Sequence, residues 1–409
     1  MNQIVIIGAG TAGANAAAAL RMAGFSGKIA LIGQESVFPY QRPPLSKSWL
    51  TAPEQPEPTL IRPAGFYAER EIELTRACKA VGIDREECQV RFGDGGLIRY
   101  DVLILATGAS PRQLDLPGGT LRGIHYLRDL DNAVELRRAL YHPDCRSVTI
   151  IGAGVIGLEV ASAAIDMGKV VTVIEAAARP MARVVSPATT NFITGRLRKY
   201  GITFLFNRKV ERFDANGDRV AAVSLRDGVR IPSDLVLVGI GAAPNVELAR
   251  EARLDCADGI CVDQDMRSSD PRIFAIGDCA CGENPFARGR VRIETVHNAV
   301  TQAQTVAEIL CDRPRPASVP PRFWSDLKAM KVQVSGIADS YDRIRCDSSN
   351  APETLEVRLM EGSQLLAVET VNLPNHQNFM SKAVEPQAEQ AVEDIGSRTA
   401  LRMTSSPSW

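Results

Sequence analysis

Residues 4–13 read IVIIGAGTAG, an apolar run that leads directly into the pattern G-x-G-x-x-G. A second copy, VTIIGAGVIG, occupies residues 148–157. Each copy predicts a buried strand, a tight turn whose backbone N–H groups can approach a pyrophosphate, and a helix whose N-terminus favours the phosphate charge. The glycines of the two turns are Gly8, Gly10, Gly13, Gly152, Gly154 and Gly157. We therefore expect an α/β protein with two Rossmann-like dinucleotide-binding domains that passes electrons between two dinucleotides.

Each glycine turn is followed by an acidic residue at the separation that a ribose site requires. In this fold a carboxylate about 20 positions beyond the glycines accepts hydrogen bonds from a ribose diol. Glu35 has this place after the first turn and Glu175 after the second, each at the end of an apolar strand. Glu175 would repel the 2′-phosphate of NADP, and the first basic residue after it is Arg179. The second site is therefore expected to take NADH.

The composition is that of an ordinary globular protein. Its 409 residues are 45% hydrophobic and 23% charged, and the net charge of −1 gives no general attraction to nucleic acid or membranes. No apolar run reaches the ~20 residues that span a bilayer. Residues 1–4, MNQI, have no basic stretch and no cleavage site, so we do not expect a secreted protein. Nine cysteines, an odd number, argue against a disulfide framework. We expect a cytoplasmic protein without a bound metal, in which Cys279 and Cys281 are small buried residues.

The remaining segments predict how the chain is organised. Both copies read as β-α-β units, over residues 1–35 and 148–175. The apolar run at 235–240 predicts a strand that returns toward the first unit, so the second unit is expected to be inserted into the first. After a Pro-rich linker, three segments alternate like antiparallel strands, at 331–334, 354–359 and 365–371. The polar tail from about residue 384 is expected to be loosely held.

Residues 39–47, PYQRPPLSK, resemble the P-Y-x-R-P-P-L-S-K signature of the oxygenase-coupled, NADH-dependent ferredoxin reductases. This is the family of the putidaredoxin reductase and aromatic-ring dioxygenase reductase type. The resemblance continues in the same order to about residue 375, through ATG at 106–108, IGLE at 156–159, GD at 277–278, RIET at 292–295 and FWSD at 323–326. It implies a glutathione-reductase-like architecture with a C-terminal α+β interface domain.

The resemblance also implies three domains. Residues 1–108 and 240–316 would form an FAD-binding domain, and residues 109–239 an NADH-binding domain inserted into it. Residues 317–409 would form the C-terminal interface domain.

On the FAD side, the resemblance implies that Arg42 and Lys47 lie along the cofactor, with Lys47 near the flavin N5 edge. A cation there would stabilise the negative charge that arrives with hydride; the alternative is a solvated loop lysine. Asp278 would bond the ribityl chain, or it could be a simple helix N-cap. The full set of expected FAD residues is Gly8, Gly10, Gly13, Glu35, Arg42, Lys47, Ala106, Thr107, Gly108, Asp278, Glu294, Val296 and Trp324.

On the NADH side, Glu159 would face the nicotinamide, and Arg183 would bind the adenosine half or the pyrophosphate. The alternatives are an exposed helix carboxylate and an ordinary surface arginine. Trp324 would shield the flavin on the electron exit route, or it could be a packing residue between domains. The expected NADH residues are Gly152, Gly154, Gly157, Glu159, Glu175, Arg183 and Gly241, and the expected catalytic residues are Lys47, Glu159 and Trp324.

The function that follows is transfer of electrons from NADH through FAD to a [2Fe–2S] ferredoxin, which would feed a Rieske oxygenase or a cytochrome P450. Disulfide reductases of related fold carry a C-x4-C pair, whereas residues 43–48 read PPLSKS, so electrons must leave the flavin directly. Basic residues expected to dock an acidic ferredoxin are Arg322, Lys328, Lys331, Arg343 and Arg345. His297 and Leu327 differ from the family pattern, His297 standing where glutamine is common.

Two other functions stay open at this point. One is an NADH reductase of rubredoxin or of a small-molecule acceptor. The other is a redox-sensing flavoprotein that resembles apoptosis-inducing factor and acts by binding partners.

Overall fold

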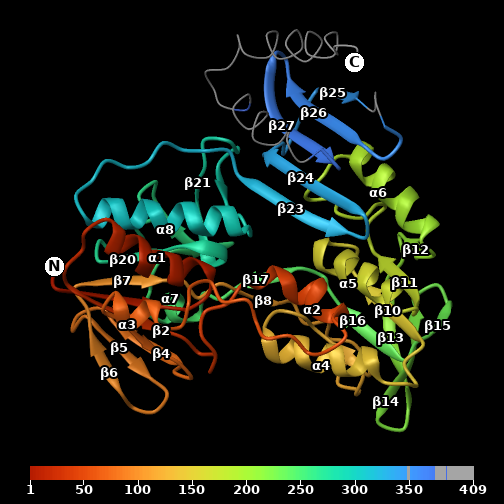
Figure 1. The fold of residues 1–409 in the computed structure, drawn as a ribbon, viewed down its shortest axis with the longest axis horizontal. Coiled ribbons are helices and arrows are strands. Elements are labelled where there is room, and N and C mark those ends of the chain that lie inside the picture. Colours follow the sequence, from red (N-terminus) through yellow and green to blue (C-terminus); the bar gives the residue numbers. More distant parts are fainter. Residues whose placement is uncertain (348–350, 374–383, 385–409) are drawn as a thin grey trace, which may run out of the picture.

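The computed structural model describes residues 1–347, 351–373 and 384. Its first sheet is parallel, with strand order β20-β7-β1-β2-β3. The strands are β1 (Gln3–Ile7), β2 (Lys28–Ile32), β3 (Ile72–Thr75), β7 (Val102–Leu105) and β20 (Ile273–Ala275). Helices α1 (Thr11–Met22) and α8 (Val296–Leu310) pack against each other beside this sheet (Figure 1). The continuous apolar runs are explained by burial on both faces, as parallel sheets require.

The second sheet repeats this arrangement, with strand order β12-β11-β10-β16-β9. Its strands are β9 (Ile124–His125), β10 (Ser147–Ile151), β11 (Val170–Glu175), β12 (Thr203–Phe206) and β16 (Leu235–Val238). It carries α4 (Leu130–Tyr141), α5 (Val155–Asp166) and α6 (Pro187–Lys199), together with an antiparallel ribbon of β13 (Val210–Asn216), β14 (Arg219–Leu225) and β15 (Arg230–Pro232). Both predicted β-α-β units are therefore present.

Two short strands join the two parallel sheets. The chain runs out through β8 (Ala109–Pro111) and returns through β17 (Ala242–Pro244), and the two strands pair antiparallel. Beside them, the Thr107 hydroxyl donates to the Asn245 carbonyl at 2.7 Å, and the Asn245 side-chain amide donates to the Thr107 carbonyl at 2.8 Å. These reciprocal bonds hold together the crossing point, the place where the outgoing chain at β8 and the returning chain at β17 lie side by side. The domain limits given above stay a prediction.

Small sheets complete the first unit. The antiparallel strands β4 (Ala80–Asp84), β5 (Gln89–Phe92) and β6 (Leu97–Arg99) form one, and β18 (Cys256–Ala257), β19 (Gly259–Val262), β21 (Ala280–Glu283) and β22 (Arg290–Val291) form another. Cys279 and Cys281 are buried, as expected.

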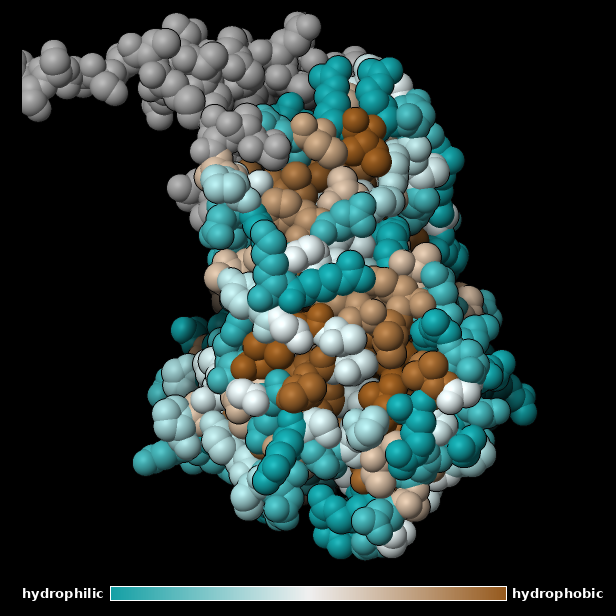
Figure 2. Space-filling view, turned by 90° about the vertical axis from the view of Figure 1, so that its right-hand side faces the viewer, coloured by the Kyte–Doolittle hydropathy of each residue, from teal (hydrophilic) through white to brown (hydrophobic). Residues whose placement is uncertain are grey.

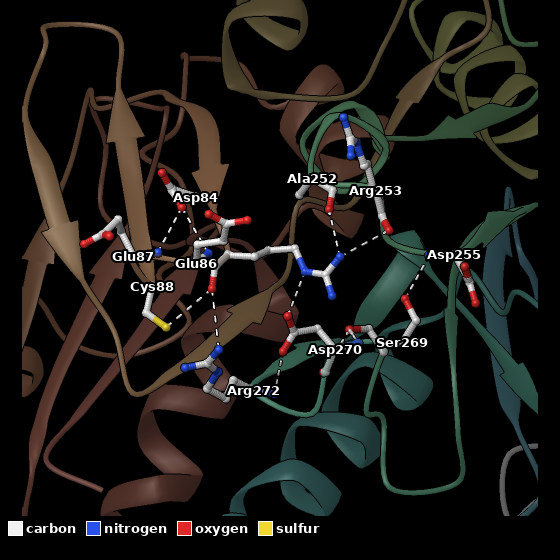
Figure 3. Close-up of polar contacts among 12 residues, drawn as sticks. Asp84, Glu86, Glu87, Cys88, Ala252, Arg253, Asp255, Ser269, Asp270 and Arg272 are labelled. Carbon is white, nitrogen blue, oxygen red and sulfur yellow. Dashed lines mark hydrogen bonds and ion pairs between the residues drawn. The ribbon is translucent and has the colours of Figure 1, made fainter.

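Arg85, in the turn between β4 and β5, attaches the first small sheet to the returning chain. Its guanidinium pairs with the Asp270 carboxylate at 2.7 Å and donates to the Ala252 carbonyl. Asp270 also accepts a bond from the Arg272 N–H at 2.9 Å, so it sits at the centre of the network in Figure 3. The network connects segments nearly two hundred residues apart in sequence.

The C-terminal sheet is antiparallel, with strand order β23-β24-β27-β26-β25. The strands are β23 (Arg322–Leu327), β24 (Met330–Gly336), β25 (Arg343–Asp347), β26 (Leu355–Glu361) and β27 (Gln364–Val371). The three predicted strands are confirmed. The sequence did not predict β23 and β25, which are the edge strands. In β23 the adjacent Phe323 and Trp324 break the alternation, and the five residues of β25 alternate but are all exposed, so no buried face marks them as a strand. The expected loose tail lies outside the described residues.

Residues 36–70 are rich in proline and form no long helix or strand. They contain three short helical turns: η1 (Pro43–Ser46), α2 (Ser48–Thr51) and α3 (Phe66–Glu69). The other short ones are α7 (Glu247–Glu251) and η2 (Gly277–Cys279). Among the described residues, no helix has both the length and the apolar character needed to cross a membrane. Viewed from the β12 side, hydrophobic residues gather in the middle of the face and hydrophilic residues surround them (Figure 2).

Candidate functional site

Most of the expected site residues line one cavity of about 1610 Å³. This volume exceeds the ~300–1,000 Å³ of an ordinary small-molecule pocket. The expected residues that line it are Gly8, Gly10, Glu35, Arg42, Lys47, Ala106, Thr107, Gly108, Glu159, Arg183, Asp278, Glu294, Val296 and Trp324. The expected residues that do not line it are Gly13, Gly152, Gly154, Gly157, Glu175 and Gly241.

The first glycine turn has the shape of a phosphate cradle. A Cβ on Gly8, whose φ is +110°, would stand 2.1 Å from the Ala106 carbonyl oxygen. A Cβ on Gly13 would stand 1.9 Å from the Gly8 oxygen, so Gly13 lies beneath the turn rather than in the cavity. Gly10 has no atom within 4 Å of that position, which leaves its backbone open on the cavity side. Packing thus requires two of the glycines, and the third leaves room for a pyrophosphate, so the turn fits the expected FAD.

The second turn follows the same plan. Gly152, with φ at +97°, approaches the Gly239 carbonyl, and Gly157 lies against the Gly152 oxygen. A Cβ on Gly154 would meet nothing closer than 3.8 Å. The residues here therefore fit a second dinucleotide, NAD(H).

Glu35 and Glu175, the two carboxylates expected at the riboses, are held differently. Glu35 accepts a bond from the Tyr40 hydroxyl at 2.6 Å and pairs with the Arg42 guanidinium at 2.5 Å. Burial raises the pKa of the Tyr40 hydroxyl, so it stays a donor. Glu175 accepts bonds from two backbone N–H groups, those of Ala153 at 2.7 Å and Ala177 at 2.8 Å. Glu175 is thereby fixed against the second glycine turn, although it does not line the cavity.

Lys47 and Glu159 meet at the boundary between the two units. The Lys47 Nζ lies 2.8 Å from the Glu159 Oε2. Glu159 is 2% exposed, so it is not an exposed helix carboxylate, although it lies on the first turns of α5. It also accepts bonds from the Ser46 hydroxyl and, at 2.7 Å, from the Ser325 hydroxyl of β23. Three parts of the chain therefore converge on one carboxylate.

Asp278 is paired rather than capping. It lies inside η2, whose N-cap is Ile276, and its carboxylate accepts from the Arg128 guanidinium at 2.9 Å. Arg42 in turn donates to the Arg128 carbonyl at 2.7 Å. Arg128 thus connects two of the expected FAD residues. Glu294 pairs with Arg292 on the same wall of the cavity.

Trp324 is 36% exposed and lines the cavity, so it is not buried in a packing interface. Its neighbour Ser325 points the other way and is fully buried, as successive residues of a strand do. His297, in the first turn of α8, is half-buried; burial and the Arg322 guanidinium lower the pKa of its imidazole. Leu327 is buried in the core beneath β23.

A loop of residues 179–186 lies beside the second glycine turn. The Met181 N–H donates to the Ala153 carbonyl at 2.9 Å. A guanidinium nitrogen of Arg183 lies close to Gly241, whose φ is +102°. It is 3.0 Å from the position that a Cβ would occupy if Gly241 had a side chain. Arg183 and Gly241 are thus brought together, with Arg183 on the cavity wall.

Several residues of the site were not singled out from the sequence. Ser46 and Ser325 stand inside the quoted motifs next to Lys47 and Trp324, so the sequence held a signal for them. Arg128 and Asn245 had none, because only the fold brings them to the crossing point.

Comparison with known proteins gives two family matches. Residues 2–303 match the pyridine nucleotide-disulphide oxidoreductase model, and residues 322–403 match the reductase C-terminal model. A rubredoxin-NAD(+) reductase of Pseudomonas putida is 47% identical over 382 residues, which cover 93% of this chain and 99% of that protein.

Two solved structures resemble the whole fold. The covalent complex of putidaredoxin reductase with putidaredoxin matches with a TM-score of 0.90 and 37% identity, covering 94% of this chain and 93% of that one. A ferredoxin reductase of the CYP199A2 system from Rhodopseudomonas palustris matches with a TM-score of 0.89 and 40% identity, covering 93% of each chain. The predicted fold class is confirmed.

Proposed function

We propose that this chain passes electrons from NADH to a small iron protein that accepts one electron at a time. The chain belongs to the pyridine nucleotide-disulphide oxidoreductase family, in its ferredoxin and rubredoxin reductase group. Proteins of this family bind FAD and NAD(H), and this chain is an oxidoreductase of that kind. The observation that carries the proposal is the Lys47–Glu159 pair, which lies in one cavity lined both by the first glycine turn and by the start of α5, the helix that follows the second turn.

The side chains around this pair set the conditions for hydride transfer. Lys47 brings a positive charge to the cavity wall, where it stabilises negative charge that arrives on the flavin. Glu159 orients the ammonium, and it is itself fixed by the hydroxyls of Ser46 and Ser325. Bound FAD supplies the conversion between the two-electron chemistry of nicotinamide and the one-electron chemistry of iron centres.

A thiol relay is disfavoured. Residues 43–48, where a C-x4-C pair would stand, contain no cysteine. Among the described residues that line the cavity, Cys78 is the sole cysteine, so no thiol pair faces the site. Electrons therefore leave the cofactor directly, past the exposed Trp324.

NADH rather than NADPH is the proposed donor. Glu175 is held against the second glycine turn by the Ala153 N–H, and a carboxylate facing the ribose there would oppose a 2′-phosphate. Arg179 is the nearest basic residue after Glu175 in sequence, but its guanidinium is bonded within its own loop. It donates to the Val185 carbonyl at 2.6 Å and to the Ala182 carbonyl at 2.9 Å. A second guanidinium near this strand end, that of Arg208, pairs with Asp227.

The acceptor is proposed to dock near β23. Arg322 and Trp324 lie on this strand and line the cavity. Arg343 and Arg345 are exposed, but they lie on β25 at the opposite edge of the sheet, four strand spacings or roughly 19 Å away. These two arginines are therefore too far from the exit point to make close contacts there, and they contribute at most to steering.

We propose a [2Fe–2S] ferredoxin as the acceptor, one that feeds a Rieske oxygenase or a cytochrome P450. The whole-chain similarity to the putidaredoxin reductase complex supports it. Rubredoxin is the second candidate, because the 47% identical relative is a rubredoxin-NAD(+) reductase.

Purified ferredoxin and rubredoxin can be compared as acceptors in steady-state turnover with NADH. A kcat/KM for ferredoxin at least tenfold above that for rubredoxin, falling as ionic strength rises, supports the first candidate. The reverse ratio establishes the second. Turnover with neither, together with slow flavin reoxidation, supports the redox-sensing alternative instead.

A further inference from the structure

Glu369, on β27 of the C-terminal sheet, is a buried carboxylate at the edge of the same cavity, and the proposed reaction does not use it. It is 1% exposed. Its oxygens accept bonds from the Ser186 N–H at 2.7 Å, from the Ser186 hydroxyl at 2.7 Å and from the Thr189 hydroxyl. A buried carboxylate is costly unless its oxygens are bonded, and these bonds all come from one end of α6.

That end of α6 is a favourable place for an anion. Ser186 is the N-cap of the helix, and the first N–H groups of a helix lack partners within it. The positive end of the helix dipole also points at the carboxylate. Burial raises the pKa of Glu369, while the Ser186 and Thr189 bonds and the nearby Arg179 act against that rise.

The same helix end closes the loop of residues 179–186, which reaches the second glycine turn. The Arg179 guanidinium holds the loop together through the Val185 carbonyl and the Thr190 hydroxyl. The Met181 N–H then donates to the Ala153 carbonyl inside the glycine turn. Hydrogen bonds at both ends of this short loop, joined by the loop backbone itself, thus link Glu369 to the turn that would hold the NADH pyrophosphate.

The loop also presents the cavity with side chains of its own. Ala182, Arg183 and Val184 line the cavity, and Val184 is more than one-third exposed. The position of the Arg183 guanidinium above Gly241 therefore depends on where the loop is held. Helix α6 packs against β26 and β27, so the C-terminal sheet sets that position (Figure 1).

We propose that Glu369 is a positioning residue for NADH: it holds the 179–186 loop over the second glycine turn and makes the C-terminal sheet part of the NADH site. The inference rests on the proposed role of the second turn as the NADH site. Removal of the carboxylate leaves the Ser186 N–H unpaired and loosens the loop, which weakens NADH binding without changing the groups at the point of hydride transfer.

The test is anaerobic stopped-flow reduction of the FAD-loaded protein by NADH, with no protein acceptor present. In Glu369→Ala we expect the apparent Kd for NADH to rise about tenfold, which corresponds to the loss of one buried charge-assisted hydrogen bond. The limiting reduction rate should stay within about twofold. Glu369→Gln can still accept from the Ser186 N–H, so its Kd should rise no more than about threefold.

Thr370→Val is the matched control. Thr370 is the next residue of the same strand and is equally buried, and its hydroxyl has no partner among the described residues. Its Kd and limiting rate should equal those of the native protein. Hydrogen exchange supplies a second measurement: the peptide of residues 179–186 should exchange faster in Glu369→Ala but not in Thr370→Val.

An unchanged Kd in Glu369→Ala, or an equal rise in Thr370→Val, overturns the proposal. If Glu369→Ala fails to retain FAD, Thr189→Val removes one bond from the other side and should raise the Kd about threefold; an unchanged value there overturns it too. Because no acceptor protein takes part, a protein that reduces neither ferredoxin nor rubredoxin can still pass or fail this test.

Discussion

Lys47 and Glu159 form an ion pair with an Nζ–Oε2 distance of 2.8 Å, although Lys47 follows the Pro-rich segment of the first unit and Glu159 lies on α5 of the second. The pair is where the two dinucleotide-binding units face each other. Glu159 is almost fully buried and Lys47 largely so. Burial of a charge costs desolvation free energy, so buried charges are retained where they are paired or serve a function.

Lys47→Gln should slow reduction of the flavin by NADH. Removal of one preorganised charged donor typically lowers the rate by about 10²-fold, and we expect that loss in the limiting rate rather than in the Kd for NADH. Stopped-flow absorbance of the flavin measures both quantities. Lys169→Gln is the control, because that ammonium binds only the Cys145 carbonyl among the described residues. A full rate in Lys47→Gln would remove the proposed electrostatic role.

Ser325→Ala should reproduce part of this effect from the C-terminal sheet. Its hydroxyl donates to Glu159 at 2.7 Å, and its loss frees the carboxylate to turn away from Lys47. We expect a decrease of about 3–10-fold in the limiting rate, equivalent to one hydrogen bond. Ser335→Ala is the matched control: this serine is as deeply buried in the neighbouring strand, and its hydroxyl has no partner in the described part of the chain. Equal effects of the two substitutions would mean general damage to the sheet.

Glu175→Ala should weaken the preference for NADH over NADPH. At its proposed place beside the ribose the carboxylate would repel a 2′-phosphate, so its removal should raise kcat/KM for NADPH by about tenfold or more and lower that for NADH. The ratio of the two kcat/KM values is the relevant measurement. A native protein that already prefers NADPH would contradict the assignment of the second site.

Asp270→Asn should destabilise the protein in a pH-dependent way. Burial alone would raise the pKa of Asp270, but the Arg272 N–H and the Arg85 guanidinium hold it below its ordinary value. A lowered folded-state pKa contributes stability that is present above the unfolded value of about 4 and is lost as pH falls through the folded value.

The melting temperature measured against pH tests this prediction. At pH 7, Asp270→Asn should lose about 1–3 kcal/mol of unfolding free energy, and the difference from the native protein should shrink below about pH 4. The exposed pair of Asp218 with Arg122 is the comparison: Asp218→Asn should melt like the native protein at every pH. A constant deficit for Asp270→Asn would show that the ion pair is not its cause.

The sequence predicted most of the architecture, and most of the residues it singled out line the cavity. The two glycine turns and their ribose acids were readable because each function needs specific residue types at a local spacing, as at Gly8 and Glu35. The partners of those residues were not readable. Arg128 reaches Asp278, and Ser325 reaches Glu159, only after distant segments fold together. Edge strand β23 was missed because its adjacent Phe323 and Trp324 break the alternation on which strand prediction depends, and β25 because its five residues are all exposed and bury no face.

The proposed function requires that this chain convert the electron pair of NADH into single electrons for an iron protein. The stoichiometry of anaerobic turnover tests this: NADH consumed, followed at its own absorbance, against ferredoxin or rubredoxin reduced. We expect sustained turnover with two acceptor molecules reduced for each NADH, as a one-electron acceptor requires. Rapid reduction of the flavin by NADH, followed by slow reoxidation with no reduced acceptor, would contradict it.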